Sequence, residues 1–181
     1  MISGPSGAGK GTVIALVKRR VANVVTSVSA TTRAPRPGEL HGREYYYLTR
    51  EEFLARVAAG EFLEWVEYSR DLYGTLRAEV DGHLARGDDV ILEIELVGAR
   101  AVRESLPHAV AVFIAPPSMA ELAERLRGRA TETDEAIARR LRIAQTEVAA
   151  AGEFDHLVIN DDAARAAAQV AAIIEDRRKE A

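Results

Sequence analysis

The sequence predicts an α/β fold, a three-layer sandwich in which helices cover a parallel sheet. Three observations favour this fold. Apolar runs rich in β-branched residues alternate along the chain with segments of helical periodicity. Hydrophobic residues make up 48% of the 181 residues, which is enough for one sizeable core. A glycine-rich segment joins the first apolar run to the first helical segment, as in the βα units that build parallel sheets.

The elements are expected in a regular order along the chain. Strands are expected where an apolar run is short, and helices where an amphipathic pattern continues for longer. Ser118 and Glu121 form a capping-box pattern directly after two prolines, which marks the start of a helix. The predicted strands of the core are 1–3, 24–29, 90–95, 110–114 and 157–160. The predicted helices are 10–20, 76–86, 97–105, 119–127, 134–150 and 162–178.

The first predicted strand is short, because only residues 1–3 precede Gly4. A buried parallel strand usually runs about five or six residues. We therefore expect further apolar residues upstream of Met1 in the natural protein.

Residues 33–75 interrupt the alternation of strands and helices. They hold the only tryptophan, a concentration of tyrosines and several turn-forming prolines and glycines. Short strands at 44–48 and 62–68 flank a helix that begins at a capping box formed by Thr49 and Glu52. We expect an inserted, mostly antiparallel subdomain here. The remaining predicted parts are a core at 1–32 and 76–181 and a small lid at about 128–133, a polar, arginine-flanked segment.

The segment after the first strand has the composition and spacing of a phosphate-binding loop. Its glycines let backbone N–H groups turn toward phosphate oxygens, Lys10 can reach the outer phosphates, and the following helix points its positive dipole end at the same anion. Gly11 stands directly after the lysine, where Ser or Thr would supply the usual hydroxyl ligand of Mg²⁺. A glycine-rich turn without a ligand is the alternative. The candidate nucleotide-binding residues are Gly4, Pro5, Ser6, Gly7, Ala8, Gly9, Lys10, Gly11 and Thr12.

Two arginines indicate a second phosphate site. Arg33 and Arg36 bracket an Ala-Pro turn that proline stiffens, and two guanidinium groups so held suit a phosphate. Tyr45 and Tyr73 offer hydroxyl donors to the same group. The alternatives are solvated arginines in a surface loop and tyrosines that pack in the core or at its rim.

Glu64 lies among bulky apolar neighbours in a predicted strand. A carboxylate accepts hydrogen bonds only, and guanine presents N1–H and an amino group side by side, whereas adenine presents an acceptor at N1. Ser29 and Thr75 offer hydroxyl donors for the guanine carbonyl. An outward-facing strand residue without a ligand is the alternative for Glu64.

Further charged side chains are expected near the phosphates. Glu93 and Glu95 share one face at the carboxyl end of an apolar strand, where open α/β sheets bind ligands and acids hold metal-bound water. A strand leaving the core is the alternative. Arg125, Arg129 and Arg140 flank the predicted lid, and phosphoryl transfer needs positive charge on the equatorial oxygens. The alternative for each is a salt-bridged helix surface.

Composition excludes several classes of function. The net charge of −4 gives no general affinity for nucleic acid, and no apolar run approaches the ~20 residues of a membrane span. The chain has no cysteine and four widely separated histidines, so neither a disulfide nor a metal-ligand cluster is expected. We therefore expect a cytoplasmic protein with small-molecule partners, and the sequence leaves its oligomeric state open.

The chain resembles the guanylate kinases along nearly its whole length. The most specific match is 27–39 (SVSATTRAPRPGE), beside the phosphate loop at 4–12. Further matching blocks are 42–47, 61–65, 73–75, 114–118, 125–133 and 158–161. The resemblance implies a P-loop nucleoside monophosphate kinase. Such an enzyme transfers the γ-phosphate of ATP, bound with Mg²⁺, to GMP or dGMP, giving ADP and GDP in purine nucleotide metabolism.

The resemblance also implies a role for each candidate residue. The expected catalytic residues are Lys10, Arg125, Arg129 and Arg140, with Asn160 and Asp161 near the ATP adenine. The GMP set comprises Arg33, Arg36, Tyr45 and Tyr73 at the phosphate, Ser29, Glu64 and Thr75 at guanine, and Glu95, where the family usually has Asp. Gly11 implies that Mg²⁺ is held mainly by phosphates and water.

Two other functions are weighed against this one. Guanylate-kinase-like protein-binding modules share the fold but lose parts of the phosphate loop, whereas this chain keeps Lys10 and the glycines. A related kinase acting on a phosphorylated sugar is disfavoured by Glu64 with Ser29 and Thr75, because that trio suits guanine.

Overall fold

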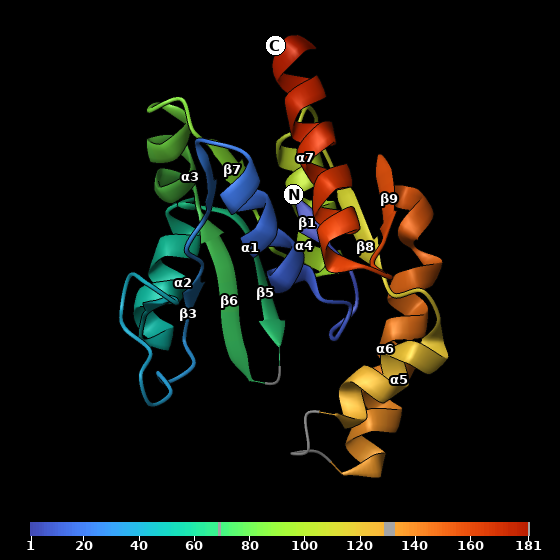
Figure 1. The fold of residues 1–181 in the computed structure, drawn as a ribbon. Coiled ribbons are helices and arrows are strands. Elements are labelled where there is room, and N and C mark those ends of the chain that lie inside the picture. Colours follow the sequence, from blue (N-terminus) through green and yellow to red (C-terminus); the bar gives the residue numbers. More distant parts are fainter. Residues whose placement is uncertain (69, 129–132, 181) are drawn as a thin grey trace. The chain divides into compact units, whose positions relative to one another are not determined.

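The computed structural model describes residues 1–68, 70–128 and 133–180 and shows the α/β class that the sequence predicts (Figure 1). The chain forms two compact units. The first comprises Met1–Ala22, Glu93–Leu96 and Val110–Ala181, and the second comprises Asn23–Leu92 and Val97–Ala109. Among the described residues, no helix combines the length and the apolar character that crossing a membrane requires.

A three-stranded parallel sheet forms the centre of the first unit. β8 (Val112–Ala115) lies between β1 (Ile2–Ser3) and β9 (His156–Ile159), and all three run in the same direction. Every residue of β8 is buried, as expected for a central parallel strand covered on both faces. The glycine-rich loop leaves β1 directly, so it begins at the carboxyl edge of this sheet.

Four helices complete the first unit, together with a short 3₁₀ turn at Ala151–Glu153. α1 (Lys10–Arg20) packs against α7 (Ala163–Glu180), and the two lie side by side in Figure 1. The other pair, α5 (Met119–Arg127) and α6 (Asp134–Ala149), buries a common apolar cluster. The buried members of that cluster are Leu122, Leu126, Ile137 and Ala144.

The second unit contains two sheets and all of residues 33–75. The smaller sheet pairs β2 (Val24–Thr26) with β7 (Asp89–Ile91) in parallel. The larger sheet has the order β4-β3-β6-β5 and is antiparallel except for the β3–β4 pair. Its strands are β3 (Ala30–Thr31), β4 (Tyr46–Tyr47), β5 (Phe62–Tyr68) and β6 (Asp71–Leu76).

Three helices belong wholly or mainly to the second unit: α2 (Arg50–Ala58), α3 (Arg77–Leu84) and α4 (Leu96–Ser105). α2 begins at the predicted capping box, in which the Thr49 side chain accepts from the Glu52 N–H and the Glu52 side chain accepts from the Thr49 N–H. Phe53 of α2 is fully buried and stacks on Phe62 with ring centroids 4.4 Å apart. This contact anchors α2 to one face of the larger sheet.

Three predicted strands are each three residues shorter in the structure. The predicted strand 24–29 ends at Thr26, because the Val28 N–H donates to the Glu79 side chain at 3.3 Å and not to a neighbouring strand. The predicted strand 90–95 is β7, which ends at Ile91, and the predicted strand 44–48 is reduced to β4. Beyond β7 the Ile94 N–H donates to the Ile2 carbonyl at 3.2 Å, and beyond β4 the Leu48 N–H donates to the Thr31 carbonyl at 2.9 Å.

Candidate active site

The glycine-rich loop of the first unit adopts a conformation that only glycine permits easily. Gly4, Gly7 and Gly9 have φ angles of 143°, 93° and 89°, in the region that L-residues rarely adopt. A Cβ added at Gly4 would lie 2.1 Å from the Ile114 carbonyl oxygen, so this residue also allows a close backbone approach to β8. α1 begins at Lys10 without a side-chain cap, which leaves its first N–H groups for an anion.

The Lys10 side chain lies along this loop. Its Nζ donates to the Gly4 carbonyl at 2.6 Å and to the Pro5 carbonyl at 3.3 Å. Burial lowers the pKa of Lys10, while the nearby charges of Glu93, Glu147 and Glu95 act in the opposite direction. The loop therefore holds a largely desolvated cation beside its glycines.

Three further side chains from distant parts of the sequence meet the loop. Asn160, which follows β9, is buried and donates from Nδ2 to the Ala8 carbonyl at 2.6 Å. Arg125 of α5 donates to the Asn160 carbonyl at 2.9 Å and to the Ala8 carbonyl at 3.5 Å. Arg140 of α6 donates to the Ser6 hydroxyl. The structure thus brings together four residues that the sequence assigned to one nucleotide site.

The remaining candidates of this group have different surroundings. Asp161 is exposed and forms an ion pair with Arg165 at 2.5 Å, which lowers the pKa of its carboxyl. Gly11 and Thr12 are exposed in the first turn of α1. Arg129 lies outside the described residues, as does the predicted lid between Gly128 and Thr133.

Glu147 of α6 was not predicted as a site residue, yet it adjoins the loop lysine. Burial and the nearby Glu95 charge raise the pKa of Glu147 to about 6, and Lys10 acts against this shift. Glu95, which the sequence assigned to GMP, is exposed and interacts electrostatically with both Lys10 and Glu147. The seven-residue spacing from Arg140 places Glu147 on the same helical face, and this signal could have identified it.

A second cluster lies in the second unit, around Arg33. Its guanidinium donates to both carboxylate oxygens of Glu39, at 2.9 and 3.0 Å, and also to the Ala34 carbonyl. The same guanidinium lies over the ring of Tyr45, 5.4 Å from its centroid, and the Tyr45 and Tyr73 rings meet edge to face at 6.1 Å. Three of the four residues predicted to bind the second phosphate therefore form one contiguous group.

Glu39 links this cluster to the second predicted arginine. Its carboxylate accepts from the backbone N–H of Arg36 and from the Tyr47 hydroxyl, each at 2.7 Å. These two hydrogen bonds, followed by those from Arg33, lower the pKa of Glu39 to about 2. The Arg36 side chain is exposed. Glu39 was not predicted as a site residue, because nothing in its sequence neighbourhood distinguishes it from a solvated turn carboxylate.

Glu64 and Thr75 form a buried pair on adjacent strands. The Thr75 hydroxyl donates to Glu64 Oε1 at 2.7 Å, and the two residues are 0% and 7% exposed respectively. Because Glu64 is buried, its carboxyl does not face solvent, and this burial raises its pKa. Thr75, which the sequence assigned to a guanine carbonyl, instead donates to Glu64. Ser29 is half-buried, and its carbonyl accepts from the Tyr46 N–H at 2.9 Å.

Comparisons with known proteins show which family the chain belongs to. A family model described as guanylate kinase matches residues 1–177. A guanylate kinase of Rubrobacter xylanophilus is 55% identical over 166 residues, covering 92% of this chain and 87% of the relative. One of Frankia casuarinae is 51% identical over 174 residues, covering 96% and 95%. The crystal structure of guanylate kinase from Anaplasma phagocytophilum superposes with a TM-score of 0.74 at 33% identity, covering 97% of this chain and 83% of that chain.

Proposed function

The chain belongs to the guanylate kinase family and transfers the γ-phosphate of ATP to GMP, giving ADP and GDP; we propose how its own residues carry out this reaction. The observation that carries the proposal is the convergence of Lys10, Arg125 and Arg140 on one glycine-rich loop. Three cationic side chains around a glycine-rich loop at the start of a helix suit a triphosphate. Asn160 and Asp161 would then lie beside the adenine of ATP.

For the transfer step, the chain supplies charge and position. The loop N–H groups and Lys10 hold the β- and γ-phosphates, and Arg125, Arg129 and Arg140 neutralise the equatorial oxygens of the transferred group. Glu121 accepts from Arg125 at 2.8 Å and holds this guanidinium toward the loop. No side chain needs to become covalently attached to the phosphoryl group, because the GMP phosphate is the nucleophile.

The GMP phosphate would occupy the cluster of Arg33, Arg36, Tyr45 and Tyr73. Glu39 binds the Arg33 guanidinium and fixes its position over the Tyr45 ring. The guanidinium is therefore oriented before a ligand binds. We assign residues 33–75 as the subdomain that carries these contacts. Glu95 is assigned to GMP near the transferred phosphoryl group, where its carboxylate can also accept hydrogen bonds from metal-bound water.

Guanine would be read by the buried Glu64, with Ser29 and Thr75 beside it. The carboxylate has lost hydration through burial, and guanine offers two adjacent N–H donors that restore its hydrogen bonds. The N1 acceptor of adenine would face the carboxylate, and neither group would have a hydrogen-bond donor. Thr75 would donate to the guanine carbonyl by turning its hydroxyl away from Glu64. Deoxyguanosine monophosphate differs only in the sugar and fits the same contacts.

Mg²⁺ would enter with ATP and be held mainly by phosphate oxygens and water. Gly11 stands where a hydroxyl ligand is usual, and the described part of the chain contains no group of three or more acids or histidines that could hold a metal ion. Glu93 and Glu95 follow β7 near Lys10 and suit hydrogen bonding to metal-bound water. When bound with ATP, the ion would supply positive charge that offsets the charge of the phosphates. We place the enzyme in the cytoplasm, with ATP and GMP as its partners.

A coupled assay of ADP formation tests this assignment. Purified enzyme is given ATP and Mg²⁺ with GMP, dGMP, AMP or ribose bisphosphate as the acceptor. We expect turnover with GMP and dGMP. Turnover with the ribose bisphosphate alone would support a sugar-phosphate kinase, and the absence of turnover with every acceptor would support a binding module; either result would overturn the proposal.

A further inference from the structure

A pocket of about 580 Å³ lies in the second unit, on the side of the larger sheet that faces α2. Leu72 and Leu76 of β6 point to this side, where they pack with Phe53 of α2. Because side chains alternate along a strand, Tyr73 and Thr75 point to the other side. Tyr73 and Thr75 of the predicted GMP set therefore face away from the pocket, whereas Tyr47, which also lines it, donates to Glu39 beside Arg33.

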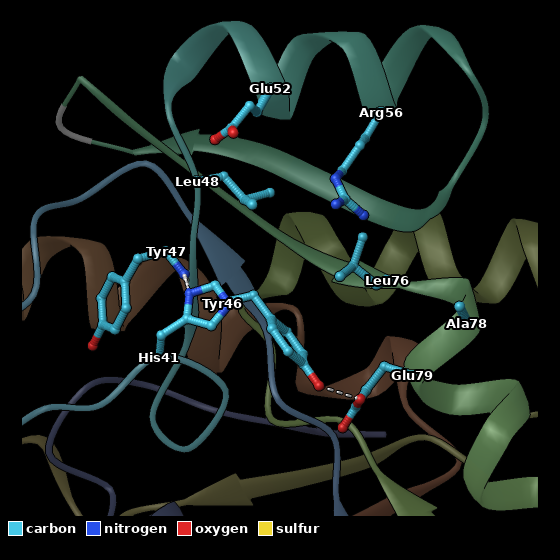
Figure 2. A pocket seen from close by; sticks show the side chains of 9 residues that line it. All are labelled: His41, Tyr46, Tyr47, Leu48, Glu52, Arg56, Leu76, Ala78 and Glu79. Atoms are coloured by element: carbon cyan, nitrogen blue, oxygen red, sulfur yellow. Dashed lines mark hydrogen bonds between the residues drawn. The ribbon is translucent and has the colours of Figure 1, made fainter.

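Glu79, in the first turn of α3, lines this pocket and joins three segments of the chain. Its Oε2 accepts from the Tyr46 hydroxyl at 2.8 Å, and its Oε1 accepts from the backbone N–H of Val28 at 3.3 Å. Figure 2 shows Tyr46 pointing toward Glu79 while Tyr47 points away from it. His83, one turn later in α3, lies 3.5 Å from Oε1 on the same side. The carboxylate is mostly buried, with 15% of the side chain exposed.

Each of the joined segments carries a residue assigned to GMP. Val28 directly precedes Ser29, Tyr46 directly follows Tyr45, and Glu79 follows Thr75 by four residues. The Tyr46 N–H also donates to the Ser29 carbonyl at 2.9 Å, so the first two segments are tied to each other as well. A shift of any one segment would move a donor that is assigned to the base or the phosphate.

We propose that Glu79 is a positioning residue that sets the affinity for GMP from the far side of the sheet. From the start of α3, Glu79 accepts hydrogen bonds from the connection between β2 and β3 and from strand β4. These hydrogen bonds hold the three segments in one arrangement. It does not touch the nucleotide. The proposal rests on the GMP site described above, because its effect is transmitted to Ser29, Tyr45 and Thr75.

The test compares four variants under steady-state conditions, at a temperature well below the unfolding midpoint of each. For Glu79→Ala we expect KM for GMP to rise about tenfold, with kcat and KM for ATP within about twofold of wild type. The reason is that the lost hydrogen bonds to the charged carboxylate hold only segments that carry GMP residues. Glu79→Gln keeps an acceptor for the Val28 N–H and should recover most of the affinity. Tyr46→Phe removes one hydrogen bond and should give a smaller rise. Glu51→Ala, which removes an exposed carboxylate from the first turn of α2, is the matched control and should match wild type.

Binding of GMP alone, followed by calorimetry, should show the same order of affinities. A Glu79→Ala variant with a lowered unfolding temperature but an unchanged KM for GMP would overturn the proposal, because Glu79 would then be only structural. A Glu79→Gln variant as weak as the alanine variant would contradict positioning through these hydrogen bonds. If wild-type protein neither bound nor phosphorylated GMP, the assigned function would fail, a result distinct from either of these.

Discussion

The Thr75 hydroxyl donates to Glu64 Oε1 across the β5–β6 pair at 2.7 Å, and both side chains are buried. A buried carboxylate costs free energy unless its oxygens are hydrogen-bonded. Thr75 is thus a structural partner of Glu64 as well as a candidate contact to the base. This double role leads to the first prediction.

Replacing Thr75 by valine should destabilise the protein even without nucleotide. The isosteric change leaves Glu64 Oε1 without this donor in the interior, which costs about 1–3 kcal/mol of unfolding free energy. Thr75→Ser keeps the hydroxyl and should lose less unfolding free energy than the valine variant. Chemical denaturation of both variants measures the difference; equal stabilities for the valine and serine variants would show that the hydrogen bond contributes nothing.

Replacing Lys10 by alanine should remove catalysis and leave GMP binding intact. Lys10 lies on the glycine loop in the first unit, whereas the residues assigned to the GMP phosphate and base lie in the second. We expect kcat to fall by about 10³-fold or more, because a cation placed on the transferred phosphates is lost. Lys18→Ala, on the exposed part of α1, is the control. Loss of GMP affinity in a calorimetric titration of Lys10→Ala would contradict the division into two clusters.

Two glycines of the same loop should respond in opposite ways to alanine. At Gly4 a Cβ would lie 2.1 Å from a carbonyl oxygen of β8, and φ is 143°, so Gly4→Ala should cost about 2 kcal/mol or more. At Gly11 nothing lies within 4 Å of the added Cβ, and the residue is helical, so Gly11→Ala should stabilise the chain by about 0.5–1 kcal/mol. Thermal unfolding followed by circular dichroism compares the pair. Similar shifts for both would show that the loop differs from the one described.

Glu147 should make stability depend on pH. Its pKa is raised from 4.5 to about 6 by burial first and by Glu95 second, so the folded state binds this proton more tightly than the unfolded state. The stabilisation from the protonated carboxyl is therefore fully present below about pH 4.5 and is lost as the pH rises through 6. The unfolding temperature of Glu147→Gln should exceed that of wild type at about pH 8, and the two should be equal at about pH 4.5. The same difference in unfolding temperature at both pH values would contradict this account of Glu147. Glu135→Gln, which changes an exposed residue of the same helix, is the matched control.

Local signals in the sequence predicted the helices well. The limits of α1 and α5 match the prediction, because a glycine turn starts the first and the Ser118 side chain, which accepts from the Glu121 N–H, starts the second. The convergence of Asn160 and two arginines on the glycine loop was also anticipated, since the resemblance assigned them to one ligand. These features depend on short-range chemistry or on a shared motif.

The features that sequence reasoning missed depend on contacts that only the folded chain makes. β2 ends early because the Val28 N–H is bound by Glu79, 51 residues away. Burial and the Glu95 charge raise the pKa of Glu147, and these surroundings exist only in the folded chain. The pKa of Glu39 is lowered by nearer partners, first the Arg36 N–H and the Tyr47 hydroxyl, which meet the carboxylate only when the turn has formed. Helical spacing places Glu147 on the face of Arg140, but pattern and propensity do not show which charges lie beside either carboxylate.

The acceptor preference of Glu64→Ala tests the central claim most directly, because Glu64 is the residue assigned to distinguish guanine from adenine. The quantity to measure is the ratio of kcat/KM for GMP to kcat/KM for AMP, in wild type and in the variant. We expect wild type to prefer GMP by about 10³-fold or more and the variant to lose most of this preference, since unpaired polar groups no longer oppose adenine. A variant that retains the wild-type ratio would contradict the account, because guanine would then be read by other residues.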